Sequence, residues 1–234
     1  MMPSDVREIL RERLASVRGR MAEAARRAGR SPSEVKLVAV SKTVSPTVAA
    51  IVHELGEADL GESRPQELWK KAAAIPGARW HLIGHLQRNK LDRTVPLVTL
   101  IHSVDSPRLL EALDAFGQAR RTPIPILLEV NCSREEAKGG FAPADLLPLA
   151  GTLASRSGVS LRGLMTMAAY TADQDQVRAT FAELRTLRDQ LRQATGLPLP
   201  ELSMGMSNDF EIAIEEGATL VRVGSTLFEG LEEG

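Results

Sequence analysis

Lys42 is the first residue whose type and position indicate chemistry. It comes just after a short apolar run, residues 37–40, whose β-branched content is typical of a strand buried on both faces. An amine at the end of such a strand either reaches solvent on its apolar stem, or is crowded into its neutral form and becomes a nucleophile toward aldehydes. Six of the 29 basic residues are lysines, and arginine cannot lose its proton. This usage adds some support for a functional amine at Lys42.

A second group of residues, near the C-terminus, could bind an anion. Ser207 and Asn208 precede a helix that is predicted to begin at Asp209, and free backbone N–H groups point outward at such a position. Gly224 follows the last predicted strand and lets the backbone approach a ligand, and Ser225 adds an N–H and a hydroxyl. The loops after the last two strands of a barrel commonly hold phosphate. A helix cap and a turn without any ligand remain the alternative.

Arg222 lies between these two loops in the predicted pattern. Val221 and Val223 point to one side of an alternating strand and Arg222 to the other, where an arginine needs a partner. A reactive lysine, a phosphate site and an arginine at one mouth together describe pyridoxal phosphate (PLP). Lys42 would form the Schiff base, the loops would hold the phosphate, and Arg222 would meet the pyridine nitrogen.

Alternating strands and helices must position these residues. Apolar runs predict strands over 37–41, 58–61, 80–84, 97–103, 124–131, 161–167, 201–204 and 219–223. Periodic patterns predict helices over 5–28, 46–55, 65–74, 86–91, 107–120, 143–155, 173–194 and 209–216. Eight strands that alternate with helices indicate an α/β fold, a single-domain (β/α)8 TIM barrel over residues 1–234 with an extra N-terminal helix. An open doubly wound sheet is the alternative, but no Gly-x-Gly-x-x-Gly motif follows the first strand.

Composition excludes several other classes of protein. The chain of 234 residues has 43% hydrophobic and 25% charged residues and a formal charge of -1, which is typical of a soluble globular domain. The near-neutral charge gives no reason to expect nucleic acid or a membrane as a partner. One cysteine, Cys132, suits a reducing compartment, and no signal peptide or membrane span is visible. We expect a cytoplasmic monomer.

Several motifs resemble the pyridoxal phosphate homeostasis protein family, whose members are similar to the N-terminal barrel of alanine racemase (PLP fold type III). They are LVAVSKTVSP (37–46), WHLIGHLQRNK (80–90), HSVD (102–105), EVNCSREEAKGG (129–140), GLMTM (163–167) and LSMGMSNDFEIAIEEGATLVRVGSTLFEG (202–230). The resemblance covers nearly the whole chain. It implies a PLP-binding protein that holds the cofactor and supplies it to PLP-dependent apoenzymes.

The resemblance also implies individual cofactor contacts. The implied cofactor-binding residues are Lys42, His81, Met204, Ser207, Arg222, Gly224 and Ser225. The family usually has Gly-Glu-Asn-Tyr after the second strand, but this chain has Ser63 in place of the asparagine. Ser63 has a shorter side chain than the asparagine that normally approaches the cofactor. Ser225 stands where threonine is more usual, a change that we expect to be nearly neutral.

Other polar residues have simpler explanations. His81 and His85 resemble a metal pair, but a strand end separates them and no third ligand is evident, so no metal is expected. Lys90 and Lys138 could guide an anion to the mouth or could be ordinary surface charges. Cys132 is expected to be a small buried hydrophobic residue.

The same residues fit either a PLP carrier or a PLP enzyme. Arg222 at the pyridine nitrogen would leave that nitrogen unprotonated and weaken the ring as an electron sink. A racemase of the alanine racemase type needs a second base, and Tyr170, the single tyrosine, follows the sixth strand. The carrier without robust catalysis is therefore favoured, with the amino-acid racemase as its alternative. A Schiff-base aldolase with a phosphorylated substrate would also use Lys42, but it does not require an arginine at a pyridine ring.

Overall fold

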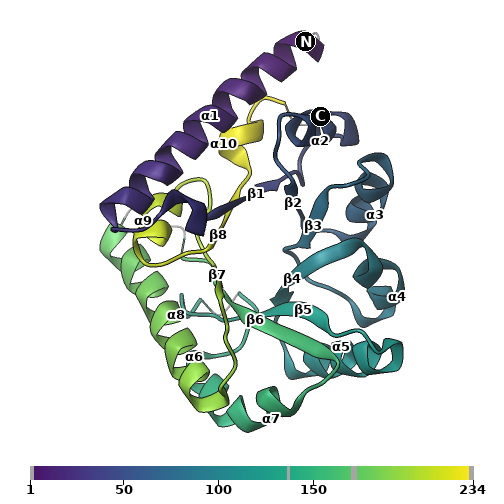
Figure 1. The fold of residues 1–234 in the computed structure, drawn as a ribbon, viewed down its shortest axis with the longest axis vertical. Helices are drawn as coiled ribbons and strands as arrows, with labels where there is room; N and C mark the ends of the chain where they lie inside the picture. The colour runs from purple at the N-terminus through teal and green to yellow at the C-terminus, as the bar shows by residue number, and fades with distance from the viewer. Residues whose placement is uncertain (1–2, 136–137, 170–172, 232–234) are drawn as a thin grey trace.

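The computed structural model describes residues 3–135, 138–169 and 173–231, and these form a closed parallel barrel. The strands follow one another around it in chain order, and β1 pairs with β8 to close it (Figure 1). The strands are β1 (Lys36–Val40), β2 (Asp59–Glu62), β3 (Arg79–Leu82), β4 (Val98–Val104), β5 (Ile124–Glu129), β6 (Val159–Met165), β7 (Glu201–Ser203) and β8 (Leu220–Val223). The predicted (β/α)8 barrel is confirmed, and the open doubly wound sheet was wrong because the two end strands pair.

Helices surround the barrel on its outer face. They are α1 (Pro3–Arg27), α2 (Pro46–Glu54), α3 (Pro65–Ala74), α4 (Leu91–Thr94), α5 (Pro107–Arg120), α6 (Pro143–Leu146), α7 (Ala150–Ser155), α8 (Gln174–Thr195), α9 (Phe210–Glu215) and α10 (Ser225–Phe228). Short 3-10 turns cover Pro32–Glu34, Arg88–Lys90, Val95–Leu97 and Leu147–Leu149. The extra helix α1 runs along one side of the barrel beside α9 and α10 (Figure 1). No helix in the described part of the chain is long and apolar enough to cross a membrane.

Local sequence signals explain where several helices begin. Pro46 and Pro107 occupy the first turns of α2 and α5, where a missing N–H costs nothing. The side chains of Ser45 and Ser106 cap these helices by accepting the N–H groups of the third helical residues. These signals determine the residue at which each of the two helices begins.

Two separate cores hold the fold together. The larger core lies between the barrel and the helices and includes Leu60, Leu113 and Phe181. The smaller core fills the barrel interior with inward-facing apolar residues from five strands and one neighbour, namely Val38, Leu100, Leu127, Met165, Leu220 and Met167. Other inward-facing positions are occupied by polar residues, and several of these belong to the candidate site.

The structure departs from the predicted helices after β3, after β5 and after β8. The expected helix over 86–91 is a 3-10 turn followed by the single turn of α4. The expected helix over 143–155 is broken into α6, a 3-10 turn and α7, because Pro148 in its middle cannot donate to the helix ladder. Helix α10 follows β8 directly and was not predicted.

Candidate functional site

Lys42 lies in the turn that follows β1 at the C-terminal end of the barrel. Ser41 before it is fully buried, whereas Lys42 itself is exposed. Within the described residues, the Lys42 amine has no hydrogen bond and no ion pair. The sequence prediction of a lysine at this strand end is therefore confirmed in position, and its amine is accessible.

A second lysine lies directly beneath this turn. Lys71 of α3 is 2% exposed, and its Nζ donates to the Ser41 carbonyl at 2.6 Å and to Glu62 Oε1 at 2.5 Å. Glu62 also accepts from the Ser41 hydroxyl and from the Ser63 N–H. This buried ion pair ties the turn that carries Lys42 to the turn after β2 that carries Ser63.

The loops after β7 and β8 meet at the same end of the barrel. The Ser207 hydroxyl accepts from the backbone N–H groups of Gly224 and Thr226, at 3.3 Å in each case. Asp209, and not Ser207, occupies the N-cap of α9, so the predicted capping role of Ser207 and Asn208 was wrong. Ser207 instead joins two loops, because its side chain reaches the first turn of α10.

Gly224 has a structural reason to lack a side chain. A Cβ at this position would lie 3.3 Å from the Val40 carbonyl oxygen, which is tighter than most Cβ contacts. The glycine thus lets the end of β8 approach the end of β1 closely. Ser225, the next residue, is exposed and begins α10. The predicted anion-binding residues are therefore brought together beside the strand that leads to Lys42.

Arg222 points into the barrel, as the alternating pattern predicted. It is 4% exposed, and its guanidinium donates to the Ser203 hydroxyl at 2.6 Å and to the Thr166 carbonyl at 2.9 Å. Burial lowers the pKa of Arg222 to about 10, and the charges of Asp209 and Glu129 oppose that shift. At neutral pH the group remains a cation, which can only donate hydrogen bonds.

His81 and Met204 are both buried, but on different sides of the barrel wall. His81 faces the interior, where its ring contacts His102 and Asp59. Met204 is fully buried in the core between the barrel and the helices. Its side chain therefore supports the end of β7 from outside, and the cofactor contact implied by the resemblance stays a prediction for both residues.

Acidic groups and one histidine lie at the mouth near the ends of β4 and β5. His85 Nδ1 lies 2.7 Å from Asp105 Oδ2, so His85 pairs with a carboxylate and not with His81. Burial raises the pKa of Glu129, and the charge of Asp105 adds to that effect while Arg222 opposes it. No group of three or more potential metal ligands occurs in the described ranges.

Lys138 is not a free cation at this mouth. Its amine donates to the Ala168 carbonyl at 3.0 Å and forms an ion pair with Glu135. The side chain thus joins the loop after β5 to the chain after β6. Lys90 is partly buried beside the start of α4.

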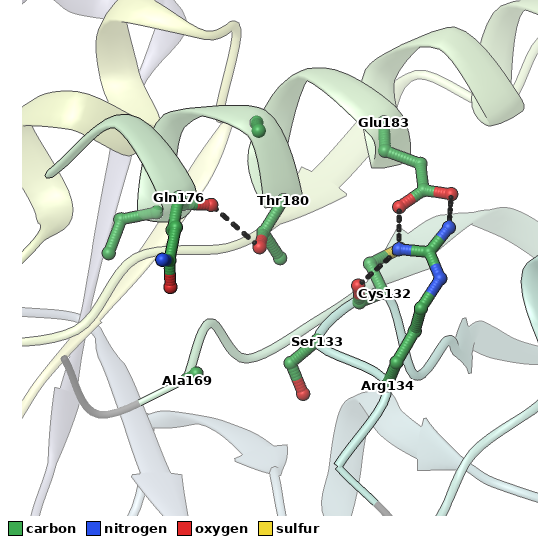
Figure 2. A pocket seen from close by; sticks show the side chains of 9 residues that line it. Cys132, Ser133, Arg134, Ala169, Gln176, Thr180 and Glu183 are labelled. Atoms are coloured by element: carbon green, nitrogen blue, oxygen red, sulfur yellow. Dashed lines mark hydrogen bonds and ion pairs between the residues drawn. The ribbon is translucent and has the colours of Figure 1, made fainter. Parts of the chain in front are cut away.

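A cavity of about 250 Å³ lies beside the loop after β5, against α8 (Figure 2). Arg134 closes one side of it through a bidentate ion pair with Glu183 and a bond to the Cys132 carbonyl. Burial raises the pKa of Cys132 to about 12, and the charge of Glu183 adds to that shift. Cys132 is therefore a small buried residue, as predicted. The cavity contains none of the predicted cofactor-binding residues.

Comparisons with known proteins place this arrangement in a family. The profile of the family described as "Alanine racemase, N-terminal domain" matches residues 13–232. The pyridoxal phosphate homeostasis protein of Aquifex aeolicus is 42% identical over 93% of this chain and 96% of its own length. That of Escherichia coli is 34% identical over 92% and 94%. The chain belongs to the pyridoxal phosphate homeostasis protein family.

Solved structures agree with membership of the pyridoxal phosphate homeostasis protein family. The structure of PipY from Synechococcus elongatus with PLP bound is 36% identical and has a TM-score of 0.82, covering 94% of this chain and 99% of that one. Alanine racemase from Corynebacterium glutamicum is 16% identical with a TM-score of 0.71, and 64% of its chain is covered. That second likeness shows the fold alone.

Sequence reasoning missed the buried partners of the site. The Lys71–Glu62 pair, Ser203 and His102 were not singled out, although all of them are at most 2% exposed. A lysine in the middle of a helix and a glutamate at the end of a strand have no local signal of burial. Their burial follows from the packing of α3 against β2 and β3. For Ser203, the strand alternation that placed Arg222 inside could have placed it there as well.

Proposed function

We propose that this protein binds PLP and acts in PLP homeostasis, holding the cofactor and supplying it to apoenzymes. The observation that carries the proposal is the meeting of three unlike groups at one end of the barrel. These are the accessible Lys42 amine, the loops joined by Ser207 and the buried cation of Arg222. A homologue 36% identical to this chain has been solved with PLP bound.

Each group matches one part of the cofactor. PLP supplies a reactive aldehyde on an electron-withdrawing ring. Lys42 would attach it through its amine, while the Ser207 hydroxyl and the backbone N–H groups of the loop from Gly224 to Thr226 would hold the phosphate. Arg222 would donate a hydrogen bond to the ring nitrogen, because a guanidinium carries no acceptor. Each charge-assisted hydrogen bond to the phosphate is worth about 1.5–3 kcal/mol.

The same residues favour a carrier over an amino-acid enzyme. Arg222 keeps the proton that a carboxylic acid would give to the ring nitrogen, so the ring withdraws electrons less strongly. A racemase of the alanine racemase type also needs a second base. Tyr170, the one tyrosine of the sequence, lies outside the described residues. The lone, buried Cys132 supports placing this carrier in the reducing cytoplasm, and we expect it to act as a monomer.

The proposal is tested first by locating the attached cofactor. The purified protein should absorb visible light, and borohydride followed by peptide mass mapping should find a pyridoxyl group on Lys42. Lys70, which is exposed and paired with Glu67 on α3, serves as an internal control that should stay unlabelled. A label mainly on Lys90 or Lys138 would overturn the assignment of Lys42.

The second half of the test separates the carrier from the racemase. The PLP-loaded protein is incubated with L- and D-alanine in deuterium oxide, and exchange at the α-carbon is followed by NMR. We expect a changed absorption spectrum, since amines exchange on the aldehyde, without measurable exchange of the α-proton. Exchange at an ordinary enzyme turnover, about 1 per second or faster, would contradict the carrier.

A further inference from the structure

A continuous chain of hydrogen bonds crosses the interior of the barrel. It starts at Arg222 NH1, which lies 2.6 Å from Ser203 Oγ, and continues over 2.8 Å to His102 Nδ1. His102 Nε2 lies 2.8 Å from His81 Nδ1, and His81 Nε2 lies 2.9 Å from Asp59 Oδ1. The five residues come from five strands, and none of them is more than 6% exposed. The chain of bonds therefore links the candidate site to the opposite end of the barrel through buried side chains, and it ends at Asp59, which pairs with the exposed Arg79.

The two ends of the chain have fixed roles in hydrogen bonding. The guanidinium of Arg222 can only donate. Burial would raise the pKa of Asp59, but the hydrogen bonds from Arg79 and His81 hold it well below the usual carboxyl range. Asp59 is therefore an ionised carboxylate that can only accept. One end of the chain supplies a proton and the other end requires one.

These ends determine every proton between them. His81 must donate from Nε2 to Asp59, so a neutral His81 ring accepts at Nδ1. His102 then donates from Nε2 and accepts at Nδ1. The Ser203 hydroxyl donates its hydrogen to His102 Nδ1, and its oxygen accepts from Arg222. Each of the four hydrogen bonds then has one donor and one acceptor, and in each of them the donor is the group on the Arg222 side.

Any other protonation state breaks the chain. A doubly protonated His81 would donate from both nitrogens, so His102 Nε2 would have to accept and His102 Nδ1 would carry the proton. His102 and Arg222 would then both donate to the Ser203 hydroxyl oxygen. The Ser203 hydrogen would then lose its acceptor in a buried site, which is costly. Burial lowers the pKa of His102 well below 6.5, and a positive charge on the neighbouring His81 or Arg222 acts in the same direction. The neutral pair is therefore the state that satisfies the interior.

We propose that Ser203, His102 and His81 are positioning residues that fix the guanidinium of Arg222, with both imidazoles neutral and protonated at Nε2. Ser203 and the Thr166 carbonyl hold two nitrogens of the guanidinium, so its plane cannot turn. The role of Arg222 at the ring nitrogen of the cofactor rests on the proposed function, whereas the protonation pattern of the two histidines does not. The charged groups that act on the chain are Asp59 and Arg79 at one end, and Arg222, Glu129 and Asp209 at the other.

The first test needs no cofactor. Nitrogen-15 NMR of the imidazoles is simple because the chain has four histidines. At neutral pH, His81 and His102 should both show a protonated Nε2 and an unprotonated Nδ1, with or without PLP. His53 and His85, which lie outside the chain of bonds, serve as internal references. A doubly protonated ring, or a proton on Nδ1 of His81 or His102, would overturn the proposal.

The second test measures PLP affinity in Ser203→Ala, with His53→Gln on α2 as the matched control. Ser203→Ala removes the acceptor of Arg222 and should weaken PLP binding roughly tenfold, while borohydride still labels Lys42. The ratio of the two dissociation constants should shrink at a pH low enough to break the neutral imidazole pattern, because the wild-type chain of hydrogen bonds is then interrupted as well. His53→Gln should bind like the wild type.

The outcomes separate this proposal from the proposed function. Equal affinities of Ser203→Ala and the wild type, or a ratio that does not change with pH, would overturn the positioning role. If the wild-type protein bound no PLP, the proposed function would fail, and the imidazole spectra would still decide the protonation pattern. Circular dichroism of each variant checks that it is folded. His102→Leu, which interrupts the chain one residue further on, should match Ser203→Ala.

Discussion

Two lysines next to the same strand end have opposite environments. Lys42 is exposed and has no partner within the described residues, whereas Lys71 is 2% exposed and bonded to Ser41 and Glu62. A buried ion pair contributes little net stability, but removing one partner leaves an uncompensated charge. Lys71 therefore serves to hold the turn that presents Lys42, and scarcity of lysine alone does not identify the reactive one.

Replacing Lys71 with methionine should destabilise the fold strongly. The change leaves the Glu62 carboxyl group, which is 0% exposed, without its cationic partner, and this costs about 3–5 kcal/mol of unfolding free energy. Urea denaturation measures the loss. Lys70→Met, one residue earlier, breaks only an exposed pair with Glu67 and should change stability by about 0–1 kcal/mol.

A double variant checks the cause. Adding Glu62→Gln to Lys71→Met replaces the buried carboxyl group that has lost its cationic partner with a neutral amide. The double variant should therefore be more stable than Lys71→Met alone. A Lys71→Met protein as stable as the wild type would contradict the role of the Lys71–Glu62 pair in holding this turn.

Helix α5 packs against the loop before β6 at an unusually short distance. A Cβ at Gly117 would lie 1.8 Å from the Gly158 carbonyl oxygen, and a Cβ at Gly158 would lie 1.8 Å from the Asp114 carbonyl oxygen. The Asp114 carboxylate also accepts the Gly158 N–H at 2.8 Å. Two glycines in backbone contact thus set the depth at which α5 sits on the barrel.

Gly117→Ala should destabilise the protein by about 1–3 kcal/mol or more, because the helix must shift away from the loop. The matched control is Gly19→Ala on α1, where a Cβ meets nothing within 4 Å. In that exposed helix interior the alanine should stabilise by about 0.5–1 kcal/mol. Thermal unfolding of both variants measures the opposite signs, and equal effects would contradict the close approach.

Ion pairs join α1 and α8 to α9 across the outside of the molecule. Glu215 of α9 bonds Arg178 at 2.7 Å and Arg27 at 2.8 Å, so one carboxylate links helices from both ends of the chain. The hydrogen bond from Arg178 lowers the pKa of Glu215, and Arg27 lowers it further. This contribution is present above the ordinary glutamate pKa and is lost as the pH falls through the lowered one.

As the pH is lowered, the stability of the whole molecule should begin to fall before Glu215 is protonated, because of His102. Below about pH 6.5 the unfolded chain binds a proton at His102, while the folded protein keeps that imidazole neutral. In this range the unfolded state holds more protons than the folded state. The free energy of unfolding therefore decreases by up to about 1.4 kcal/mol for each unit by which the pH is lowered. Urea denaturation between neutral pH and the carboxyl range measures this slope.

The control for this slope is a histidine outside the barrel. His102→Gln should remove the decline, and His53→Gln should keep it. Glu129 and Asp209, whose pKa values are raised by burial, act in the opposite direction, but only where carboxylates titrate. An unchanged slope in His102→Gln would contradict the assignment to His102.

The sequence by itself determined the architecture and the first groups of the site. Strand and helix periods, with Pro46 and Pro107 at helix starts, predicted the barrel, because these signals act within a few residues of each other. Strand alternation placed Arg222 inside, and the end of a buried strand placed Lys42 at the mouth. Motifs along the chain indicated the family that the comparisons then showed.

Tertiary structure alone decided how these groups are held. Lys71 and Glu62 meet because α3 packs over β2, and Ser203 meets His102 because β7 and β4 face each other across a closed barrel. Ser207 reaches Thr226 only after β7 and β8 pair. Such contacts join residues 9 to 101 positions apart. The local pattern of the chain carries no signal of them, because closure of the barrel brings them within hydrogen-bonding distance.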